Sequence, residues 1–285
     1  MKTELYLIKP FTNMHVGSGK TNSGIVDNTI QRDVLTGYPI INSTSLKGAL
    51  REYVKLKIGI DITNTVFGKA NEKKNGKEDN QIENKPGTHI FFSAHLLTLP
   101  ARSDKTAFLN VTTPSIIEDF LKQSDRLDKT IINETTIKTF EKLSSQQPDK
   151  AVCFDKKIED CIVEFYDIKT SFLQIFSPEE LSILRRYLGP HFVLMNNKLF
   201  SDKIANKLPV IARNCLENGQ STNLWYEEII PRETVFYTFI AASQDNWNKF
   251  NKTNFHMKSI QIGANSSVGY GYSEIYQIEE KGGPV

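Results

Sequence analysis

Alternating and periodic apolar positions predict a strand and a helix near the start of the chain. Residues 3–9 have strand composition and are followed by Pro10, which cannot donate a backbone hydrogen bond to a sheet. Four small polar residues at 42–45, any of which could cap a helix, precede a second apolar set. That set recurs at helical spacing: Leu46, Ala49, Leu50, Tyr53 and Val54. We therefore expect a strand, a glycine-bearing loop at 15–19 and a helix that ends near Gly59.

The same periodicity places three cations on one side of the expected helix. Lys47, Arg51 and Lys55 recur at every fourth residue, beside the apolar stripe. Such a row is either a solvated helix face or a basic ridge that contacts an anionic partner, and the pattern alone favours the solvated face.

The middle of the chain has weaker patterns. Residues 69–87 hold one aliphatic side chain in their interior, Ile82, so we expect a mobile surface loop there. A capping box with a proline at the first helical position predicts a helix from Ser177 to Leu188. Shorter patterns predict one strand and two helices, at 88–99, 115–123 and 136–143.

Two extended arms towards the C-terminal side predict a β-hairpin. Residues 210–216 and 224–230 flank a polar turn that contains Asn218-Gly219, a pair that accepts the positive φ angles of a tight turn. A glycine-rich segment follows at 260–272, and residues 274–278 again have strand composition. We find no internal repeat.

Composition indicates a folded protein with a buried core. The 285 residues are 39% hydrophobic, which is enough for one large domain or two small ones. No run of about 18 apolar residues occurs and the N-terminus is charged, so we expect neither a membrane span nor a signal peptide. The 3 cysteines lack CxxC spacing, which argues against a disulfide framework and against a zinc site. The expected location is the cytoplasm.

Positive charge is concentrated at the N-terminal end of the chain. The formal net charge is only +2, but residues 1–60 carry a net +4 and the remainder carries −2. A polyanion is attracted by clustered charge more than by the total, so a nucleic-acid footprint should begin in this part of the chain.

Four sequence blocks and one further motif carry a resemblance to a known family. The blocks are HVGSG at 15–19, GIVDN at 24–28 with QRD at 31–33 and TG at 36–37, the stretch from Pro39 through SLKGALR at 45–51, and the glycine-rich 263–271. Together they resemble the RAMP superfamily of CRISPR proteins. The motif LWYEE at 224–228 resembles more specifically the repeated backbone subunit of the type III-B (Cmr) effector complex.

The resemblance implies an α+β fold with a single RAMP domain over residues 1–285. Its core would be a four-stranded antiparallel sheet like that of an RNA recognition motif (ferredoxin-like), backed by helices. The mobile loop at 69–87 and a mainly helical region at 100–200 would be insertions into this core. Residues 208–231 would form a projecting β-hairpin thumb that reaches towards the next subunit and wedges into a guide–target duplex.

The resemblance also implies partners: a guide CRISPR RNA, a complementary single-stranded target RNA, further copies of the chain in a helical filament, and other subunits of the type III-B complex. Phosphate contacts bind a guide without reading its sequence, and backbone N–H groups at 43–51 together with nearby cations would supply them. The expected RNA-binding residues are His15, Gly17, Gly19, Arg32, Ser45, Lys47, Arg51, Arg213, Trp225, Tyr226, Gly263, Gly269 and Gly271. For His15 and the glycines, tight turns around a hydrogen-bonded histidine are the alternative interpretation.

Asp27 is the expected catalytic residue. In the family, the aspartate at this motif position is needed for metal-dependent cleavage of target RNA. Its carboxylate could hold Mg²⁺, or alternatively Mn²⁺, which would stabilise charge at the scissile phosphate while the neighbouring 2′-OH attacks. His15 and Glu227 are supporting candidates. From the residues alone, Asp27-Asn28 is explained by turn chemistry and Glu227 by a plain strand.

Three alternatives stay open on the sequence. The chain could be a non-catalytic scaffold that binds guide and target RNA, in which case Asp27 would be dispensable. It could be the type III-A backbone subunit, although those relatives tend to lack the LWYEE motif. It could also be a CRISPR precursor RNA-processing endonuclease, a class that tends to act alone and to use a histidine as general base.

Overall fold

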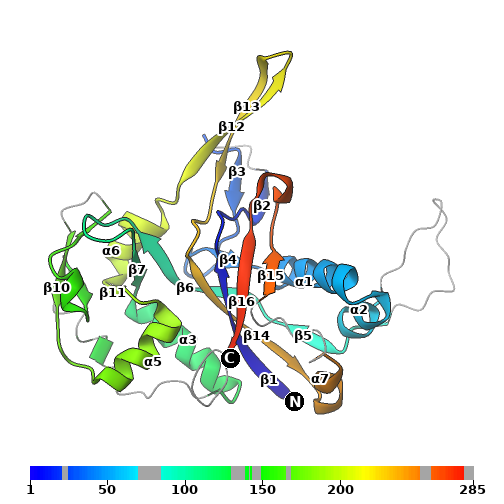
Figure 1. Ribbon diagram of the computed structural model, residues 1–285, viewed down its shortest axis with the longest axis horizontal. Helices are drawn as coiled ribbons and strands as arrows, with labels where there is room; N and C mark the ends of the chain where they lie inside the picture. Colours follow the sequence, from blue (N-terminus) through cyan, green and yellow to red (C-terminus); the bar gives the residue numbers. More distant parts are fainter. Residues whose placement is uncertain are drawn as a thin grey trace.

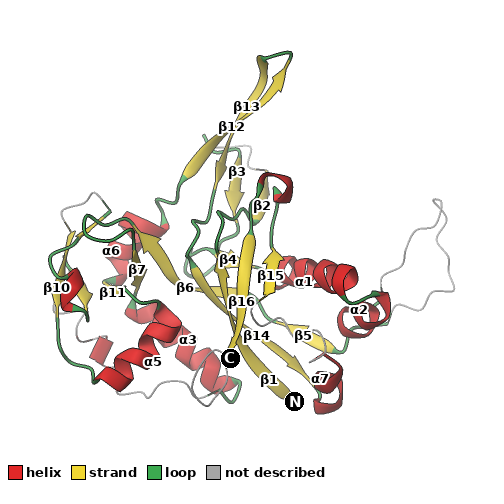
Figure 2. Ribbon diagram, viewed as in Figure 1, coloured by secondary structure: helices red, strands yellow, loops and turns green. Residues whose placement is uncertain are grey.

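The computed structural model describes residues 1–20, 25–69, 85–129, 139–140, 142, 149–164, 168–250 and 258–278. Within these ranges, helices and strands form a mixed α/β arrangement around one large sheet (Figure 1, Figure 2). Most of the loop expected at 69–87 and of the helix expected at 136–143 lies outside the described residues. In the described part of the chain, no helix is both long and apolar enough to cross a membrane.

The centre of the large sheet combines strands from both ends of the chain. β1 (Lys2–Pro10), the strand expected from the sequence, pairs antiparallel with β14 (Val235–Ala242) on one edge and β16 (Tyr272–Ile278) on the other. β6 (Ala94–Ala101) extends the sheet beyond β14, and β15 (Lys258–Gln261) extends it beyond β16. β1 and β14 are buried along almost their whole length, because they have neighbours on both edges and side chains packed on both faces.

Shorter strands border this centre. Beyond β6 the order continues through β7 (Leu109–Thr112), β11 (Phe192–Met195), β8 (Ala151–Cys153), β10 (Ile168–Phe172) and β9 (Ile162–Val163). β4 (Ile40–Ile41) pairs with β6, and β5 (His89–Phe91) pairs with β14.

The N-terminal helix forms where the apolar period predicts it. α1 (Ser43–Lys57) buries Leu46, Leu50 and Val54, the stripe expected from the sequence, and contacts β15 and β5. It ends before Gly59, whose φ of 127° is unfavourable for other residues, and α2 (Ile60–Phe67) begins there. After β14, α7 (Gln244–Phe250) contacts β14 and α2.

The region 100–200 contains more strand than the sequence indicates. Its described helices include α3 (Pro114–Arg126), α5 (Pro178–Leu188) and α6 (Asn197–Phe200), with a 3-10 turn at Lys156–Ile158, and a π turn follows α6 at Ser201–Ala205. The capping box at Ser177 is present as expected. The strands β7 to β11 interleave with these helices. Short apolar runs such as those of β8 and β11 fit a buried helix and a buried strand equally well, and pairing with distant segments decides between them.

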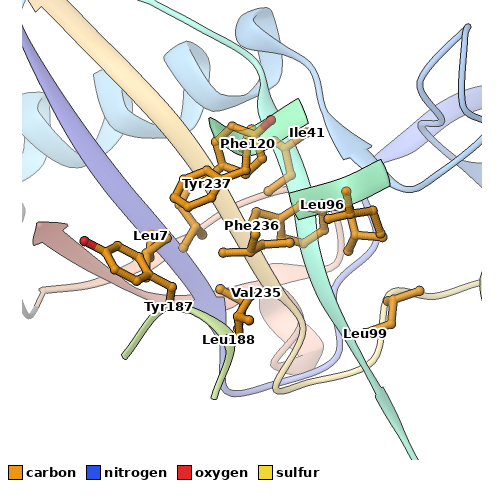
Figure 3. Close-up of a cluster of buried hydrophobic side chains, with 14 of the residues drawn as sticks. Leu7, Ile41, Leu96, Leu99, Phe120, Tyr187, Leu188, Val235, Phe236 and Tyr237 are labelled. Atoms are coloured by element: carbon orange, nitrogen blue, oxygen red, sulfur yellow. The ribbon is translucent and has the colours of Figure 1, made fainter. Parts of the chain in front are cut away.

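Aromatic and aliphatic side chains join the sheet to the helices of this region. Figure 3 shows Tyr237 and Phe236 of β14 among Leu96 of β6, Phe120 of α3 and Tyr187 of α5. The rings of Phe120 and Tyr237 meet edge to face with centroids 4.7 Å apart, and the Tyr237 hydroxyl donates to Asp119 at 2.7 Å. The sheet and the region 100–200 therefore share one continuous core.

A long hairpin projects from the body of the molecule (Figure 1). β12 (Val210–Glu217) and β13 (Gln220–Glu228) pair antiparallel where the sequence predicts a hairpin. The turn residues Asn218 and Gly219 both have positive φ, 51° and 80°. On its other edge β13 runs parallel to β3 (Asn28–Ile30), which pairs with β2 (Gly17–Lys20). The strand order of this second sheet is β12-β13-β3-β2.

Candidate functional site

Three of the four sequence blocks meet at the foot of the hairpin, where β12 begins and β13 ends. β3, in the second block, runs beside β13. Next to the first block, Met14 and Ile230 exchange backbone hydrogen bonds of 2.9 and 2.8 Å. In the fourth block, the Ala264 N–H donates to the His15 carbonyl at 2.9 Å. Segments from the two ends of the chain thus form one surface around the hairpin foot.

Asp27 is exposed beside β13, immediately before β3. Its backbone N–H donates to the Tyr226 carbonyl at 3.0 Å, and its Oδ2 accepts from the Tyr226 N–H at 2.8 Å. The pair of bonds fixes the backbone and the side chain together. A carboxylate is thereby presented to solvent in a defined orientation at the hairpin foot.

Glu227, the next residue along β13 after Tyr226, is buried and surrounded by donors. Its Oε1 accepts from Trp225 Nε1 at 2.8 Å and from Asn28 Nδ2 at 3.4 Å. Its Oε2 accepts from an Arg213 guanidinium nitrogen at 3.1 Å and from Asn265 Nδ2 at 2.9 Å. Burial alone would raise the pKa of this carboxyl, but the hydrogen bonds from Trp225 and Arg213 and the Arg213 charge lower the pKa below its usual range. Glu227 is therefore an ionised acceptor whose two oxygens are already engaged.

Arg213 closes the same network from β12. Its guanidinium lies over the Trp225 ring, 5.7 Å from the centroid, and over the Tyr270 ring at 5.8 Å, while it pairs with Glu227. This geometry is a cation between two aromatic faces, tied to a buried acid. The sequence suggests Arg213 as a phosphate contact, whereas the structure shows it joining the hairpin to the glycine-rich segment.

His15 lies inside the hairpin foot. Only 5% of its surface is exposed, and its Nδ1 donates to the Glu228 carbonyl at 2.7 Å. A side chain on Gly17 would place its Cβ 2.9 Å from His15 Nε2, so the glycine leaves room for the imidazole. The described contacts are those of a hydrogen-bonded histidine two residues before β2.

Arg32 and Glu228 form a second ion pair behind the site. The Arg32 guanidinium pairs with Glu228 and donates to the carbonyls of Gly37 and Ala205 at 2.9 and 3.0 Å. Glu228 also accepts from the Ile30 N–H at 3.1 Å. Arg32 is thus committed to contacts within the protein that hold β3 and the π turn against the hairpin foot.

Gln31 links the glycine segment to the start of α1. Its amide nitrogen donates to the Gly17 carbonyl at 3.2 Å and to Ser45 Oγ at 2.9 Å, and its oxygen accepts from the Asn42 N–H at 2.9 Å. Lys47 lies on the next turn of α1 and is half-buried. No role for Gln31 was predicted, because a bridge between two backbone segments leaves no local pattern.

Arg51, one turn further along α1, contacts the protein itself. It donates to the Gly68 carbonyl at 2.6 Å, which ties α1 to the end of α2. Lys47 and Arg51 are the two cations of this helix that were expected to bind phosphate. The described contacts leave that role more open for Lys47 than for Arg51.

The sequence profile of the RAMP superfamily matches residues 7–274 of the chain. The chain belongs to the RAMP superfamily. Among relatives of this RAMP protein, the CRISPR system Cmr endoribonuclease Cmr4 of Pyrococcus furiosus is 28% identical over 96% of the chain and 95% of its own length.

Solved structures show the same fold. A type III-B Cmr-beta complex bound to cognate target RNA contains a chain with a TM-score of 0.73 and 20% identity, and the match covers 97% of both chains. Oligomeric Cmr4 from Pyrococcus furiosus has a TM-score of 0.67 and 22% identity over 97% of this chain and 98% of its own. These comparisons agree with the type III-B resemblance noted from the sequence.

A divalent ion would find few protein ligands at the hairpin foot of this RAMP protein. No group of three or more His, Cys, Asp or Glu side chains converges anywhere in the residues that the structure describes. Glu227 does not suit a metal, because both of its oxygens already accept hydrogen bonds. Asp27 does fit, since Mg²⁺ is commonly held by one or two carboxylates with substrate phosphates and water filling the remaining positions.

Two glycines of the RAMP C-terminal block are required by close backbone contacts. At Gly263 an added Cβ would overlap the His15 carbonyl, and at Gly271 it would overlap the Ile262 carbonyl. Both residues have positive φ, 93° and 77°. Gly269 (φ 83°) and Gly19 (φ 106°) are different, because an added Cβ would meet nothing within 4 Å. Close backbone contact and positive φ therefore both call for glycine at 263 and 271.

We expect Gly271→Ala to lower the free energy of unfolding by about 2–5 kcal/mol, the sum of a left-handed backbone cost and a steric clash. Gly269→Ala is the matched control, because it pays only the backbone cost of about 1–2 kcal/mol. Urea denaturation of both variants measures the difference. Equal destabilisation of the two would show that the contact with Ile262 is not what requires a glycine.

Proposed function

We propose that this RAMP chain is a repeated backbone subunit of a type III-B CRISPR effector complex, which binds guide RNA and cleaves a complementary target RNA. The observation that carries the proposal is the exposed Asp27 carboxylate, held by two hydrogen bonds to Tyr226 at the foot of a projecting hairpin. A relative named as an endoribonuclease aligns over 96% of the chain, and a neighbour of the same fold has been solved with target RNA.

The core of the sheet supports a ferredoxin-like interpretation. The strands β16-β1-β14-β6 are consecutive in the sheet, and each pair of neighbours is antiparallel. In chain order α1 follows β1 and precedes β6, while α7 follows β14 and precedes β16. This is the order of a split βαβ fold such as an RNA recognition motif, with the remaining elements as insertions.

The hairpin is suited to act as a thumb. On its two arms, Leu216 and Leu224 are 64% and 54% exposed, although water is an unfavourable environment for these side chains. Exposed apolar side chains on a projecting hairpin can enter between stacked bases, as apolar wedges do in other nucleic-acid complexes. Copies of the chain arranged along a guide would then each insert one hairpin, and so separate the duplex at regular intervals.

At the cleavage site, the chain's own contribution is to position a carboxylate. The Tyr226 N–H holds Oδ2 of Asp27, and the network around Glu227 fixes the strand that carries Tyr226. A Mg²⁺ or Mn²⁺ ion held by Asp27 would supply charge stabilisation at the scissile phosphate. A nucleotide displaced by the hairpin can reach the in-line geometry that its 2′-OH needs, and such positioning contributes several orders of magnitude in rate.

Lys47 is the expected phosphate contact on α1. We expect Lys47→Ala to weaken RNA binding for all sequences alike and to reduce the salt exponent by about 0.7, the value for one phosphate contact on a single strand. Lys57→Ala, an exposed cation in the last turn of the same helix, is the control. Fluorescence anisotropy at several salt concentrations measures the exponents. If both variants give the wild-type exponent, Lys47 does not contact phosphate.

Reconstitution with the other subunits and a defined guide tests the proposal. Several copies of the chain should assemble on one guide RNA and cut a labelled complementary RNA at evenly spaced positions when a divalent ion is present. A chain that assembles and binds target without cutting would be a scaffold. A chain that cuts precursor RNA alone and without metal would be a processing endonuclease instead.

A further inference from the structure

A cationic groove lies at the hairpin foot, outside the four sequence blocks. Its volume is about 580 Å³, within the usual range for ligand sites. Pro209, which leads into β12, and Pro231, which follows β13, line it together with Phe108 and the π turn that precedes β12. In the order β12-β13-β3, Asp27 adjoins the β13 edge that faces β3, whereas Pro209 of the groove leads into β12 on the other edge of β13.

The groove lining carries an excess of positive charge. Four cations line it, Arg102, Lys203, Lys207 and Arg232, against two acids, Glu164 and Glu233. Both acids are already engaged. Glu164 accepts a two-point contact from Arg102 at 2.9 and 2.8 Å, so this acid and this cation offset each other, and Glu233 pairs with Lys9, outside the lining, at 2.6 Å. The groove therefore favours an anionic occupant.

Hydrogen bonds tie together the segments that frame the groove. The Ile229 N–H donates to the Pro209 carbonyl at 2.9 Å, which closes the hairpin foot between the two prolines. The Arg232 N–H donates to Asn13 Oδ1 at 3.2 Å, so the backbone that carries this cation is fixed. The floor is formed by the buried Ile204 and Leu208. A preformed groove loses little entropy when it binds a ligand.

We propose that this groove binds a short segment of single-stranded RNA, on the side of the hairpin away from Asp27. The exposed Lys207 and Arg232 contact phosphates, and the half-buried Phe108 ring stacks against a base. A charged channel with an aromatic platform is how proteins hold single strands without reading sequence. The inference rests on the proposed function: RNA held on both sides of the hairpin foot would be constrained at the linkage that Asp27 faces.

The test uses the full-length chain and a fluorescent oligouridine RNA. We expect Lys207→Ala and Arg232→Ala each to reduce the salt exponent of binding by about 0.7, and the double variant by about 1.4. Phe108→Leu, which keeps an apolar side chain, should weaken binding by about tenfold and leave the exponent unchanged. Lys169→Ala, an exposed cation on β10, is the control and should bind as wild type does.

Failure of the groove inference and failure of the proposed function give different results in this test. If wild type binds RNA and the groove variants keep its affinity and exponent, the groove inference is wrong while the proposed function stands. If wild type binds no RNA alone or in the assembled complex, the proposed function itself fails. The groove variants could also lose self-association while they keep their RNA affinity. Sedimentation without RNA would detect this outcome. It would make the surface a protein interface and overturn the inference.

Discussion

Replacing Asp27 by asparagine is expected to reduce target cleavage by the reconstituted complex at least about 100-fold while RNA binding stays unchanged, because loss of one electrostatic stabiliser of a transition state has this effect. An asparagine oxygen can still accept from the Tyr226 N–H, which bonds to Asp27 Oδ2 at 2.8 Å. The substitution therefore removes the charge and keeps the local fold. Single-turnover cleavage of a labelled target in Mg²⁺ measures the effect.

Two controls make the Asp27 result specific. Glu52→Gln removes an exposed carboxylate from α1 and should leave cleavage unchanged. Target affinity of the Asp27→Asn complex should match wild type, since Asp27 is proposed to hold metal rather than to bind phosphate. Cleavage at the wild-type rate and spacing by Asp27→Asn would remove the catalytic proposal and favour a scaffold.

Replacing Glu227 by leucine is expected to lower the free energy of unfolding by about 3–5 kcal/mol, because one partner of a buried ion pair is left without the other. Four donors would lose their acceptor, from Trp225, Asn28, Arg213 and Asn265. Cleavage should fall as well, since these contacts hold the strand on which Tyr226 positions Asp27. Urea denaturation gives the stability, and the same cleavage assay gives the activity.

Glu217→Leu is the matched control for Glu227, because the residue is exposed near the hairpin turn and should change stability by no more than about 0.5 kcal/mol. Adding Arg213→Met to Glu227→Leu should recover part of the lost stability, since the uncompensated cation is removed. If Glu227→Leu is as stable as Glu217→Leu, the network does not hold the hairpin foot.

The lowered pKa of Glu227 adds a pH dependence with a defined sign. A carboxyl whose folded pKa lies below its unfolded value of about 4.3 contributes stability above that value and loses it as pH falls through the folded pKa. Wild type should therefore have a larger free energy of unfolding than Glu227→Gln at neutral pH. This difference should narrow as the pH falls below the usual pKa of a glutamate. A gap that is constant with pH would contradict an ionised Glu227.

Local patterns were sufficient to predict several elements. The stripe of Leu46, Leu50 and Val54 predicts α1, and Asn218-Gly219 predicts the hairpin turn, because each depends on residues close in sequence. The strands of the region 100–200 could not be predicted this way. β11 pairs with β7, about eighty residues earlier, and a short apolar run does not reveal such a partner.

The site was predictable in its location but not in its contacts. Asp27 and His15 were candidates for catalysis and the glycine-rich segment for RNA binding, and the structure places all three at the hairpin foot. Arg213 and Arg32 were expected to bind RNA, yet both are paired with buried acids. The charge of an arginine can be read from sequence, whereas its partner here lies on another strand. The groove residues escaped notice for the same reason, since they come from separate segments.

The position of Asp27 relative to target RNA is the most direct test of the account. Electron cryomicroscopy of the complex with a target carrying 2′-deoxy nucleotides at the cleavage positions would capture the uncut strand. We expect one target linkage per copy to lie roughly 4 Å from the Asp27 carboxylate, the span of a single bridging Mg²⁺. An Asp27 side chain that points away from every target linkage, with no RNA at the hairpin foot, would contradict the account.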